Sequence, residues 1–229
     1  MNNPTIILVH GFWGGAAHWS KVIVELANMG YGSIKAVDMP LTSLADDAER
    51  TRKMIAQESG PVLLVGHSYG GAVITAVGDQ PNVVGLVYIA AFAPDAGESP
   101  GGITQDHPPL AAANLVLDTD GYLWVRPETF HESFGHDLTP EEGLVLAVTQ
   151  KAPLASTFGD VIAVPAWKKK PSWYQISSED RMIAPENQDR MSARMGAKKV
   201  ITLAASHASL MSKPIEIAAL IDEALKSLE

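Results

Sequence analysis

The chain lacks cysteine, long apolar runs and an excess of positive charge, and each absence excludes a class of protein. Without cysteine it can form neither a disulfide framework nor a thiolate metal site. Its 17 lysines and arginines are outnumbered by 26 aspartates and glutamates, which gives a formal net charge of −9. The basic run at 168–170 is short and predicts a solvated loop. Because a phosphate backbone requires a basic binding face, we expect no nucleic-acid partner.

No apolar run approaches the roughly 20 residues that a helix needs to cross a bilayer, so we expect no membrane partner. Residues 1–10 predict a strand and show neither a basic segment nor a cleavage site, so we expect no secretory signal. These features predict a cytoplasmic protein that acts on a small molecule. A homodimer remains open as a further partner.

The 229 residues, 46% of them apolar and 19% charged, suit one globular α/β domain with an insertion. Short apolar runs typical of buried strands alternate with segments of helical periodicity. The predicted strands are 5–9, 34–37, 62–65, 82–91, 172–176 and 199–203. The predicted helices are 18–28, 43–59, a segment that opens at Gly71, 185–195 and 214–228. This alternation predicts right-handed βαβ units and a doubly wound, mostly parallel sheet with helices on both faces.

Residues 100–170 interrupt the alternation, because they are richer in proline, glycine and histidine and their aromatic residues follow no clear period. We interpret them as a small inserted cap over the carboxyl edge of the sheet, with the core formed by residues 1–99 and 171–229. Within the cap, Asp120-Gly121 predicts a hairpin turn. Thr139-Pro140 predicts the start of a helix.

A candidate nucleophile follows the third predicted strand. The strand ends in Gly66-His67-Ser68-Tyr69-Gly70, which matches G-x-S-x-G, and the helical pattern then opens. This motif indicates a nucleophile elbow when a strand precedes it and a helix follows it, as here. We expect a strained backbone at Ser68, with the hydroxyl lifted off the sheet toward the positive end of the helix.

A serine hydroxyl needs a base within hydrogen-bond reach, and that base needs a third group to hold its tautomer. His207 is the best candidate base because it directly follows the last strand, at the sheet edge where Ser68 also emerges. His10 and His67 are expected to bond to the backbone. His131 and His136 lack the spacing of metal ligands on a helix, so we expect no metal.

Asp180 is the candidate orienting acid, since it follows the strand 172–176 and a short loop and reaches the same edge. Glu179 and Asp95 also follow strand ends and stay open as alternatives. The order Ser68, Asp180, His207 is the Ser…Asp…His order of α/β-hydrolases.

A glycine-rich loop, His10-Gly11-Phe12-Trp13, follows the first strand and lacks both the G-x-G-x-x-G spacing and the Walker lysine. We interpret it as an oxyanion loop, in which the backbone N–H groups of Phe12 and Tyr69 face the reaction centre. The candidate substrate pocket is apolar and aromatic. Its predicted side chains are Trp13, Trp124, Phe130 and Phe134.

Four segments together resemble the α/β-hydrolase superfamily: His10-Gly11-Phe12-Trp13, Gly66-His67-Ser68-Tyr69-Gly70-Gly71, Ser177-Ser178-Glu179-Asp180 and Ser206-His207. The layout is similar to the small-cap esterases of the plant methylesterase and hydroxynitrile lyase group. The resemblance covers nearly the whole chain. It implies hydrolysis of an ester through an acyl-serine intermediate without a cofactor. The pocket residues suggest a small, neutral and fairly hydrophobic ester.

Two positions depart from the lyase branch of that group. Its members carry a hydroxyl residue in the strand-end loop and a lysine after the histidine, where this chain has Gly11 and Ala208. Hydrolysis is therefore favoured. Two alternatives stay open: a non-hydrolytic member, either a lyase or a cofactor-free oxygenase that uses His207 and Asp180 as a base pair, and a ligand receptor on a hydrolase scaffold.

Overall fold

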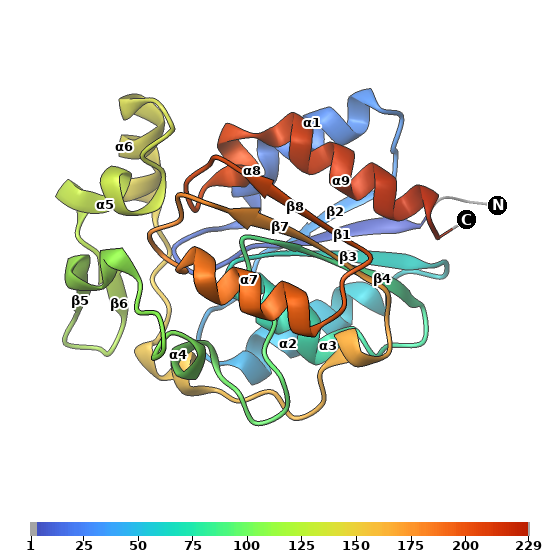
Figure 1. The fold of residues 1–229 in the computed structure, drawn as a ribbon, viewed down its shortest axis with the longest axis horizontal. Helices are drawn as coiled ribbons and strands as arrows, with labels where there is room; N and C mark the ends of the chain where they lie inside the picture. The colour runs from blue at the N-terminus through green and yellow to red at the C-terminus, as the bar shows by residue number, and fades with distance from the viewer. Residues whose placement is uncertain (1–3, 229) are drawn as a thin grey trace.

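The computed structural model describes residues 4–228, and within them six parallel strands form the central sheet (Figure 1). The order across the sheet is β2-β1-β3-β4-β7-β8, and every neighbouring pair in it is parallel. The strands are β1 (Thr5–Val9), β2 (Ile34–Val37), β3 (Val62–His67), β4 (Val83–Ile89), β7 (Ser172–Ser177) and β8 (Lys199–Leu203). The predicted doubly wound α/β fold is confirmed, because helices cover both faces of this sheet.

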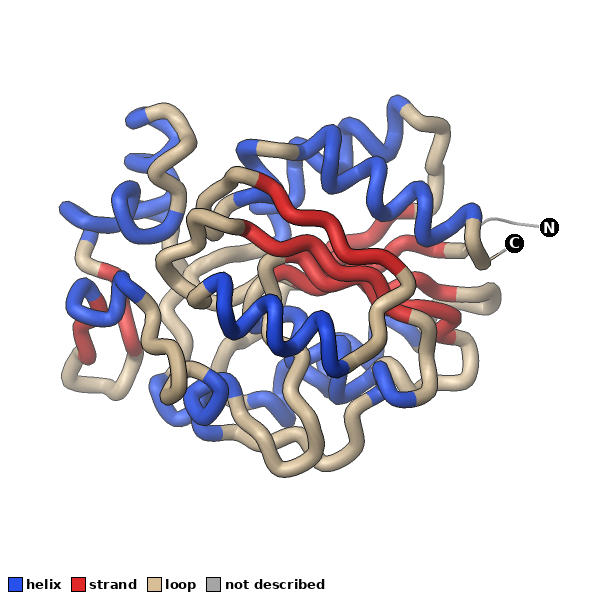
Figure 2. Tube along the Cα trace, viewed as in Figure 1, coloured by secondary structure: helices blue, strands red, loops and turns tan. Residues whose placement is uncertain are grey.

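The central strands are buried on both faces, and their side chains alternate between two cores. Along β1, Ile7 and Val9 enter one hydrophobic core, while Ile6 and Leu8 enter the other. Helices α2, α3 and α7 lie on one face, and α1, α8 and α9 lie on the other (Figures 1 and 2). Their bounds are α1 Ser20–Asn28, α2 Leu44–Ile55, α3 Tyr69–Val77, α7 Pro185–Arg194, α8 Ser209–Ser212 and α9 Pro214–Lys226.

Helix α2 begins as predicted and ends earlier than predicted. Its N-cap is Ser43, whose hydroxyl accepts a hydrogen bond from the Asp46 amide at 3.0 Å. The helix ends at Ile55 instead of near residue 59. The reason is a tertiary contact: the side-chain amide of Asn82 donates to the carbonyls of Ile55 and Glu58, both at 3.2 Å, and so satisfies the end of the helix.

Much of the segment between β4 and β7 lies beyond the carboxyl ends of the strands, and its last part runs back past α3 to the start of β7 (Figure 1). Its helices and strands are α4 (Pro100–Ile103), β5 (Leu115–Leu117), β6 (Leu123–Val125), α5 (Pro127–Phe134) and α6 (Pro140–Thr149). It also contains three 3₁₀ turns, η2 (Leu110–Asn114), η3 (Ala155–Gly159) and η4 (Ala166–Lys168). The predicted hairpin is confirmed, with β5 antiparallel to β6 and Gly121 at φ +87°. The predicted helix start is also confirmed, because Thr139 and Glu142 form a reciprocal capping box on α6.

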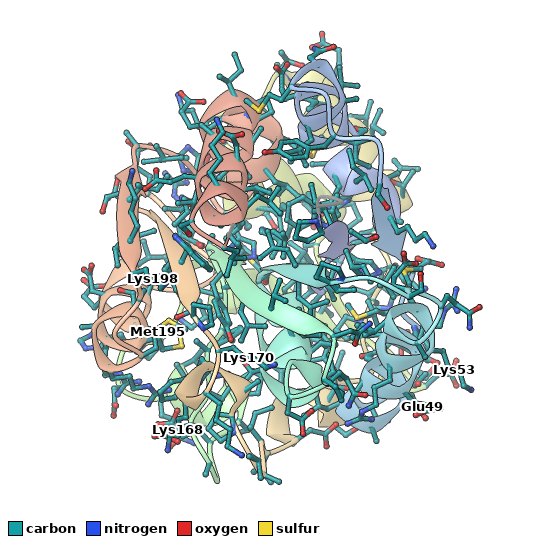
Figure 3. The ribbon with its side chains drawn as sticks, turned by 90° about the vertical axis from the view of Figure 1, so that its right-hand side faces the viewer. Glu49, Lys53, Lys168, Lys170, Met195 and Lys198 are labelled. Atoms are coloured by element: carbon teal, nitrogen blue, oxygen red, sulfur yellow. The ribbon has the colours of Figure 1, made fainter. Side chains whose placement is uncertain are left out.

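Charged side chains lie around the periphery at the end of the molecule opposite the cap (Figure 3). The basic run contributes to this region but is more than a solvated loop. Lys168 forms an ion pair with Asp95, and the Lys170 ammonium donates to the Val83 carbonyl at 2.6 Å. Among residues 4–228, no helix is both long enough and apolar enough to cross a bilayer.

Candidate active site

The turn between β3 and α3 holds Ser68 in a rare backbone conformation, with φ 55° and ψ −125°. The flanking glycines make this turn sterically feasible. A Cβ atom at Gly66 would lie 2.6 Å from the Gly70 carbonyl oxygen, and one at Gly70 would lie 2.3 Å from the Val9 carbonyl oxygen. Both distances are too short for any side chain, so the elbow requires glycine on each side of Ser68. The expected strained turn is present.

Three side chains from distant parts of the chain form one hydrogen-bonded row. The His207 ring bonds through Nε2 to the Ser68 hydroxyl at 2.8 Å and through Nδ1 to Asp180 Oδ2 at 2.7 Å. Ser68 follows β3, Asp180 follows β7 and His207 follows β8, and parallel strands deliver their carboxyl ends to one edge of the sheet. All three residues are 3% exposed or less.

The Asp180 carboxylate is held by three further N–H donors. Oδ1 accepts from the amides of Met182 at 2.7 Å and Ile183 at 2.9 Å, and Oδ2 accepts from the Gln188 side chain at 2.8 Å. Because an ionised carboxylate can only accept hydrogen bonds, His207 Nδ1 must carry the proton and donate it to Asp180. The opposite nitrogen of the His207 ring is then free to accept the proton of the Ser68 hydroxyl. Sequence reasoning missed Gln188, because nothing in the helical pattern of α7 marks it.

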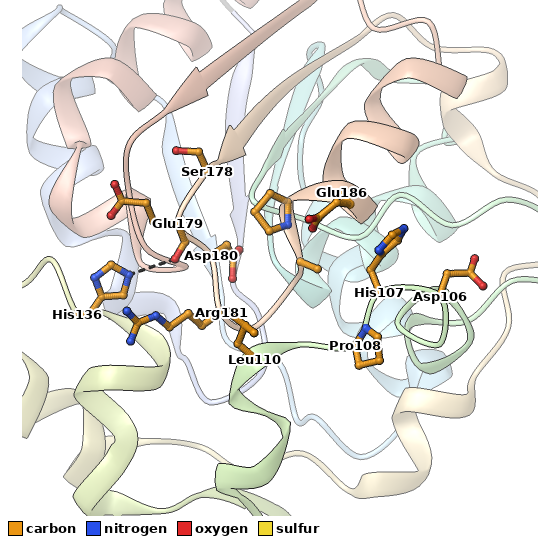
Figure 4. A pocket seen from close by; sticks show the side chains of 12 residues that line it. Asp106, His107, Pro108, Leu110, His136, Ser178, Glu179, Asp180, Arg181 and Glu186 are labelled. Carbon is orange, nitrogen blue, oxygen red and sulfur yellow. Dashed lines mark hydrogen bonds between the residues drawn. The ribbon is translucent and has the colours of Figure 1, made fainter.

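Neither alternative acid contacts His207. Glu179 is exposed, and its side chain points away from that of Asp180 (Figure 4). Asp95 is paired with Lys168 at a different part of the rim. Of the three acids that the sequence left open, the structure brings only Asp180 to the histidine.

The other histidines near Ser68 are fixed by the backbone or by burial. His67 bonds through Nε2 to the His207 carbonyl at 2.8 Å, and burial lowers its pKa well below the ordinary value. His10 donates from Nδ1 to the Gly11 carbonyl at 2.8 Å and accepts at Nε2 from the Met39 amide at 3.0 Å. Burial lowers the pKa of His18 to about 4. The lowered pKa values keep the His18 and His67 rings neutral at neutral pH. The expected backbone bonds of His10 and His67 are present.

The loop after β1 passes directly beside the Ser68 hydroxyl. A Cβ atom at Gly11 would lie 2.9 Å from Ser68 Oγ and 2.5 Å from Ser68 Cβ, so only glycine fits there. Within residues 4–228, the backbone N–H groups of Phe12 and Tyr69 donate to no protein acceptor. Two free N–H groups in a buried site could bind an oxygen that gains negative charge. No cluster of three or more acidic or histidine side chains suited to a metal occurs among the described residues.

A cavity of about 320 Å³ opens beside Ser68, and its lining carries no charged side chain. The lining residues are Phe12, Trp13, Ser68, Phe92, Thr104, Gln105, Pro108, Pro109, Ala111, Ala112, Leu115, Leu123, Phe158 and Met182. Phe92 lies three residues after the carboxyl end of β4, which is a position that the strand pattern could have revealed. Phe158 lies in the cap, where no periodicity marks it.

Of the four predicted pocket residues, only Trp13 lines this cavity, and the prediction is wrong for the other three. Phe134 packs edge-on against the His207 ring at 4.9 Å, and Phe130 stacks on Phe134 at 5.1 Å. Both are fully buried between the cap and the core. Trp124, in β6, is exposed, and its indole N–H donates to Asp118 at 2.8 Å.

A second hollow of about 530 Å³ lies on the outer side of the Asp180 loop (Figure 4). It is open and charged, and its lining includes Asp106, Glu179, Arg181 and Glu186. Since it reaches neither Ser68 nor His207, the apolar cavity is the better candidate for substrate binding.

The fold and the site define a hydrolase of the α/β type, and comparison with known proteins agrees. The alpha/beta hydrolase family model matches residues 6–220, so the chain belongs to this family. The probable hydrolase R7 of a Phoma species is 26% identical, over 97% of this chain and 98% of that protein. Methylesterase 7 of Arabidopsis thaliana is also 26% identical, over 97% of this chain and 96% of that protein. The predicted resemblance to the plant methylesterase group is confirmed.

The fold is shared with solved structures at lower identity. The crystal structure of a pyrethroid hydrolase from Sphingobium faniae matches with a TM-score of 0.82 at 22% identity, over 98% of both chains. At this identity the match concerns the fold alone.

Proposed function

We propose that this protein is a serine carboxylesterase in which Ser68 is the nucleophile, His207 the general base and Asp180 the group that orients the histidine. The observation that carries the proposal is the row of two short hydrogen bonds, 2.8 Å from Ser68 Oγ to His207 Nε2 and 2.7 Å from His207 Nδ1 to Asp180. Ester hydrolysis is also the activity named for the relatives called methylesterases.

The geometry supports the following sequence of steps. The Ser68 oxygen attacks the ester carbonyl carbon while its proton moves to His207 Nε2. The carbonyl oxygen becomes an oxyanion, which accepts from the N–H groups of Phe12 and Tyr69. The C–O bond to the alcohol breaks as His207 returns the proton to the leaving oxygen. Water then attacks the acyl-serine by the same route and releases the acid, which restores the Ser68 hydroxyl.

The substrate is a small, neutral and fairly hydrophobic ester. A cavity of about 320 Å³ is at the small end of the range of ligand sites, and its aromatic and aliphatic lining would leave a charged group unpaired. Thr104 and Gln105 are the polar side chains of the lining apart from Ser68. They could contact an uncharged polar substituent.

The two positions at which this chain differs from the lyase branch, Gly11 and Ala208, favour hydrolysis over lyase chemistry. The backbone at Gly11 cannot accommodate a hydroxyl side chain, because its Cβ would overlap Ser68. Ala208, which is fully buried, supplies no cation beside His207.

The proposal is tested by labelling with a fluorophosphonate and by turnover of p-nitrophenyl acetate. We expect a covalent adduct on Ser68, and we expect Ser68→Ala to lower kcat by several orders of magnitude. Ser227→Ala is the matched control, since Ser227 bonds only within the end of α9 and should label and turn over like the wild type. A correctly folded wild-type protein that is labelled elsewhere or not at all would refute the proposal. Substantial activity of Ser68→Ala on the true substrate would instead favour a base-pair mechanism.

A further inference from the structure

A buried carboxylate outside the Ser68–His207–Asp180 row has no role in the mechanism above. Asp47, in α2, is fully buried. Its Oδ1 accepts from the Leu41 amide at 2.8 Å and its Oδ2 from the Tyr69 hydroxyl at 2.8 Å. Among the described residues no cation pairs with it. Burial raises its pKa. A buried acid held by neutral donors adds little net stability, so stability alone does not account for the pair.

Asp47 is connected through the Tyr69 side chain to Phe12, the other residue whose backbone N–H faces the oxyanion site. The Tyr69 ring stacks on the Phe12 ring, with centroids 3.9 Å apart and planes 12° from parallel. Phe158 contacts the Phe12 ring at 4.5 Å. Phe12 lies in a loop, and its own N–H has no backbone acceptor within residues 4–228. Its orientation therefore depends on how its ring is packed, and the hydroxyl bond to Asp47 fixes the ring against which it packs.

Asp47 also braces the loop from the other side. Asp47 accepts from the amide of Leu41, whose backbone has φ +61°. The Leu41 carbonyl in turn accepts from the Leu154 amide at 2.9 Å, and Leu154 directly precedes η3, the turn that contains Phe158. Two residues before Leu41, the Met39 amide donates to His10, whose ring donates to the Gly11 carbonyl. The two oxygens of Asp47 thus join the Tyr69 ring to the segment that supports His10 and Gly11.

We infer that Asp47 is a positioning residue for the oxyanion site: by holding the Tyr69 hydroxyl, it sets the Tyr69–Phe12 stack and so aims the Phe12 N–H at the developing oxyanion. This inference rests on the proposed esterase function. It concerns the transition state, so it predicts a loss in kcat with little change in KM.

The test measures kcat per active site, counted by fluorophosphonate labelling, for Asp47→Ala, Asp47→Asn and Tyr69→Phe. Loss of one oxyanion donor costs 10²–10³ in kcat, and a misaimed donor should cost less, so we expect Asp47→Ala and Tyr69→Phe to lower kcat by about 10–100-fold with KM within about twofold. Asp47→Asn keeps a partner for the Tyr69 hydroxyl and should recover most of the activity. The double variant Asp47→Ala/Tyr69→Phe should be no slower than the slower single variant, because both remove the same bond.

Tyr88→Phe is the matched control. It removes another buried tyrosine hydroxyl, which bonds to Thr75 at 2.9 Å on the far side of α3, and it should leave kcat unchanged. Binding of an aryl trifluoromethyl ketone, whose adduct places an oxyanion in the site, should weaken by the same factor as kcat/KM.

Two results would overturn the inference: unchanged kcat per labelled site in Tyr69→Phe, or losses that multiply in the double variant. Tyr69→Phe decides the matter if Asp47→Ala does not fold. Failure of the esterase proposal would look different, since wild-type Ser68 would then not be labelled at all.

Discussion

Replacing Asp180 by asparagine should invert the tautomer of His207 while leaving the fold in place. Asparagine has nearly the same shape, and its oxygen can keep the two amide bonds from Met182 and Ile183. The new NH₂ group then occupies the position of Oδ2, where two donors already converge, Gln188 Nε2 at 2.8 Å and His207 Nδ1 at 2.7 Å. A donor cannot bond to a donor. The histidine avoids the conflict by moving its proton to Nε2, which faces Ser68 and can then no longer accept the serine proton.

The expected loss in kcat is about 10³–10⁴-fold, by analogy with the same change in a serine protease, where the geometry is kept and the wrong tautomer results. This corresponds to about 4–5.5 kcal/mol of transition-state stabilisation. The assay is turnover of p-nitrophenyl acetate at neutral pH, with circular dichroism and a melting curve to verify folding.

The matched control for Asp180→Asn is Glu179→Gln, the same chemical change at the neighbouring acid. Glu179 is exposed and does not contact His207, so we expect kcat within about twofold of the wild type. If folded Asp180→Asn loses less than about tenfold, or if Glu179→Gln loses as much as Asp180→Asn, the tautomer argument is wrong.

Two predictions concern stability. Gly70→Ala places a Cβ 2.3 Å from the Val9 carbonyl oxygen, so we expect it to lower the free energy of unfolding by about 3 kcal/mol or more in urea titrations, whereas Gly32→Ala, with no atom within 4 Å of the new Cβ, should have little effect. The pKa of buried His18 is lowered to about 4 from 6.5, so the unfolded chain binds a proton that the folded chain refuses. The stability from this residue is complete above pH 6.5 and declines by about 3 kcal/mol as the pH falls to about 4. His18→Gln should flatten this decline in urea titrations at pH 4–7, and an unchanged slope would contradict the assignment.

The cap shows where sequence reasoning failed. Phe130 and Phe134 were expected in the pocket because they are aromatic residues in the cap, yet they pack under it, and Phe134 supports the His207 ring. An aromatic side chain has the same hydrophobicity whether it lines a cavity or fills one. Which of the two occurs depends on the angle at which α5 meets the core, and that angle is set by contacts between segments far apart in the chain.

The local order of residues was enough to predict the sheet, the elbow, and the nucleophile and base of the hydrogen-bonded row, Ser68 and His207, with Asp180 as one of three candidate acids. Apolar runs and helical periods report burial within a few residues, and parallel strands bring whatever follows them to a common edge. Only the tertiary structure determined three contacts: Asp180, and neither Glu179 nor Asp95, bonds to His207; Gln188 bonds to Asp180; and Asp47 bonds to the Tyr69 hydroxyl. Each of these depends on side-chain direction and on distances of less than 3 Å across segments that are remote in sequence, and hydrogen bonds are sensitive to such distances while sequence patterns are not.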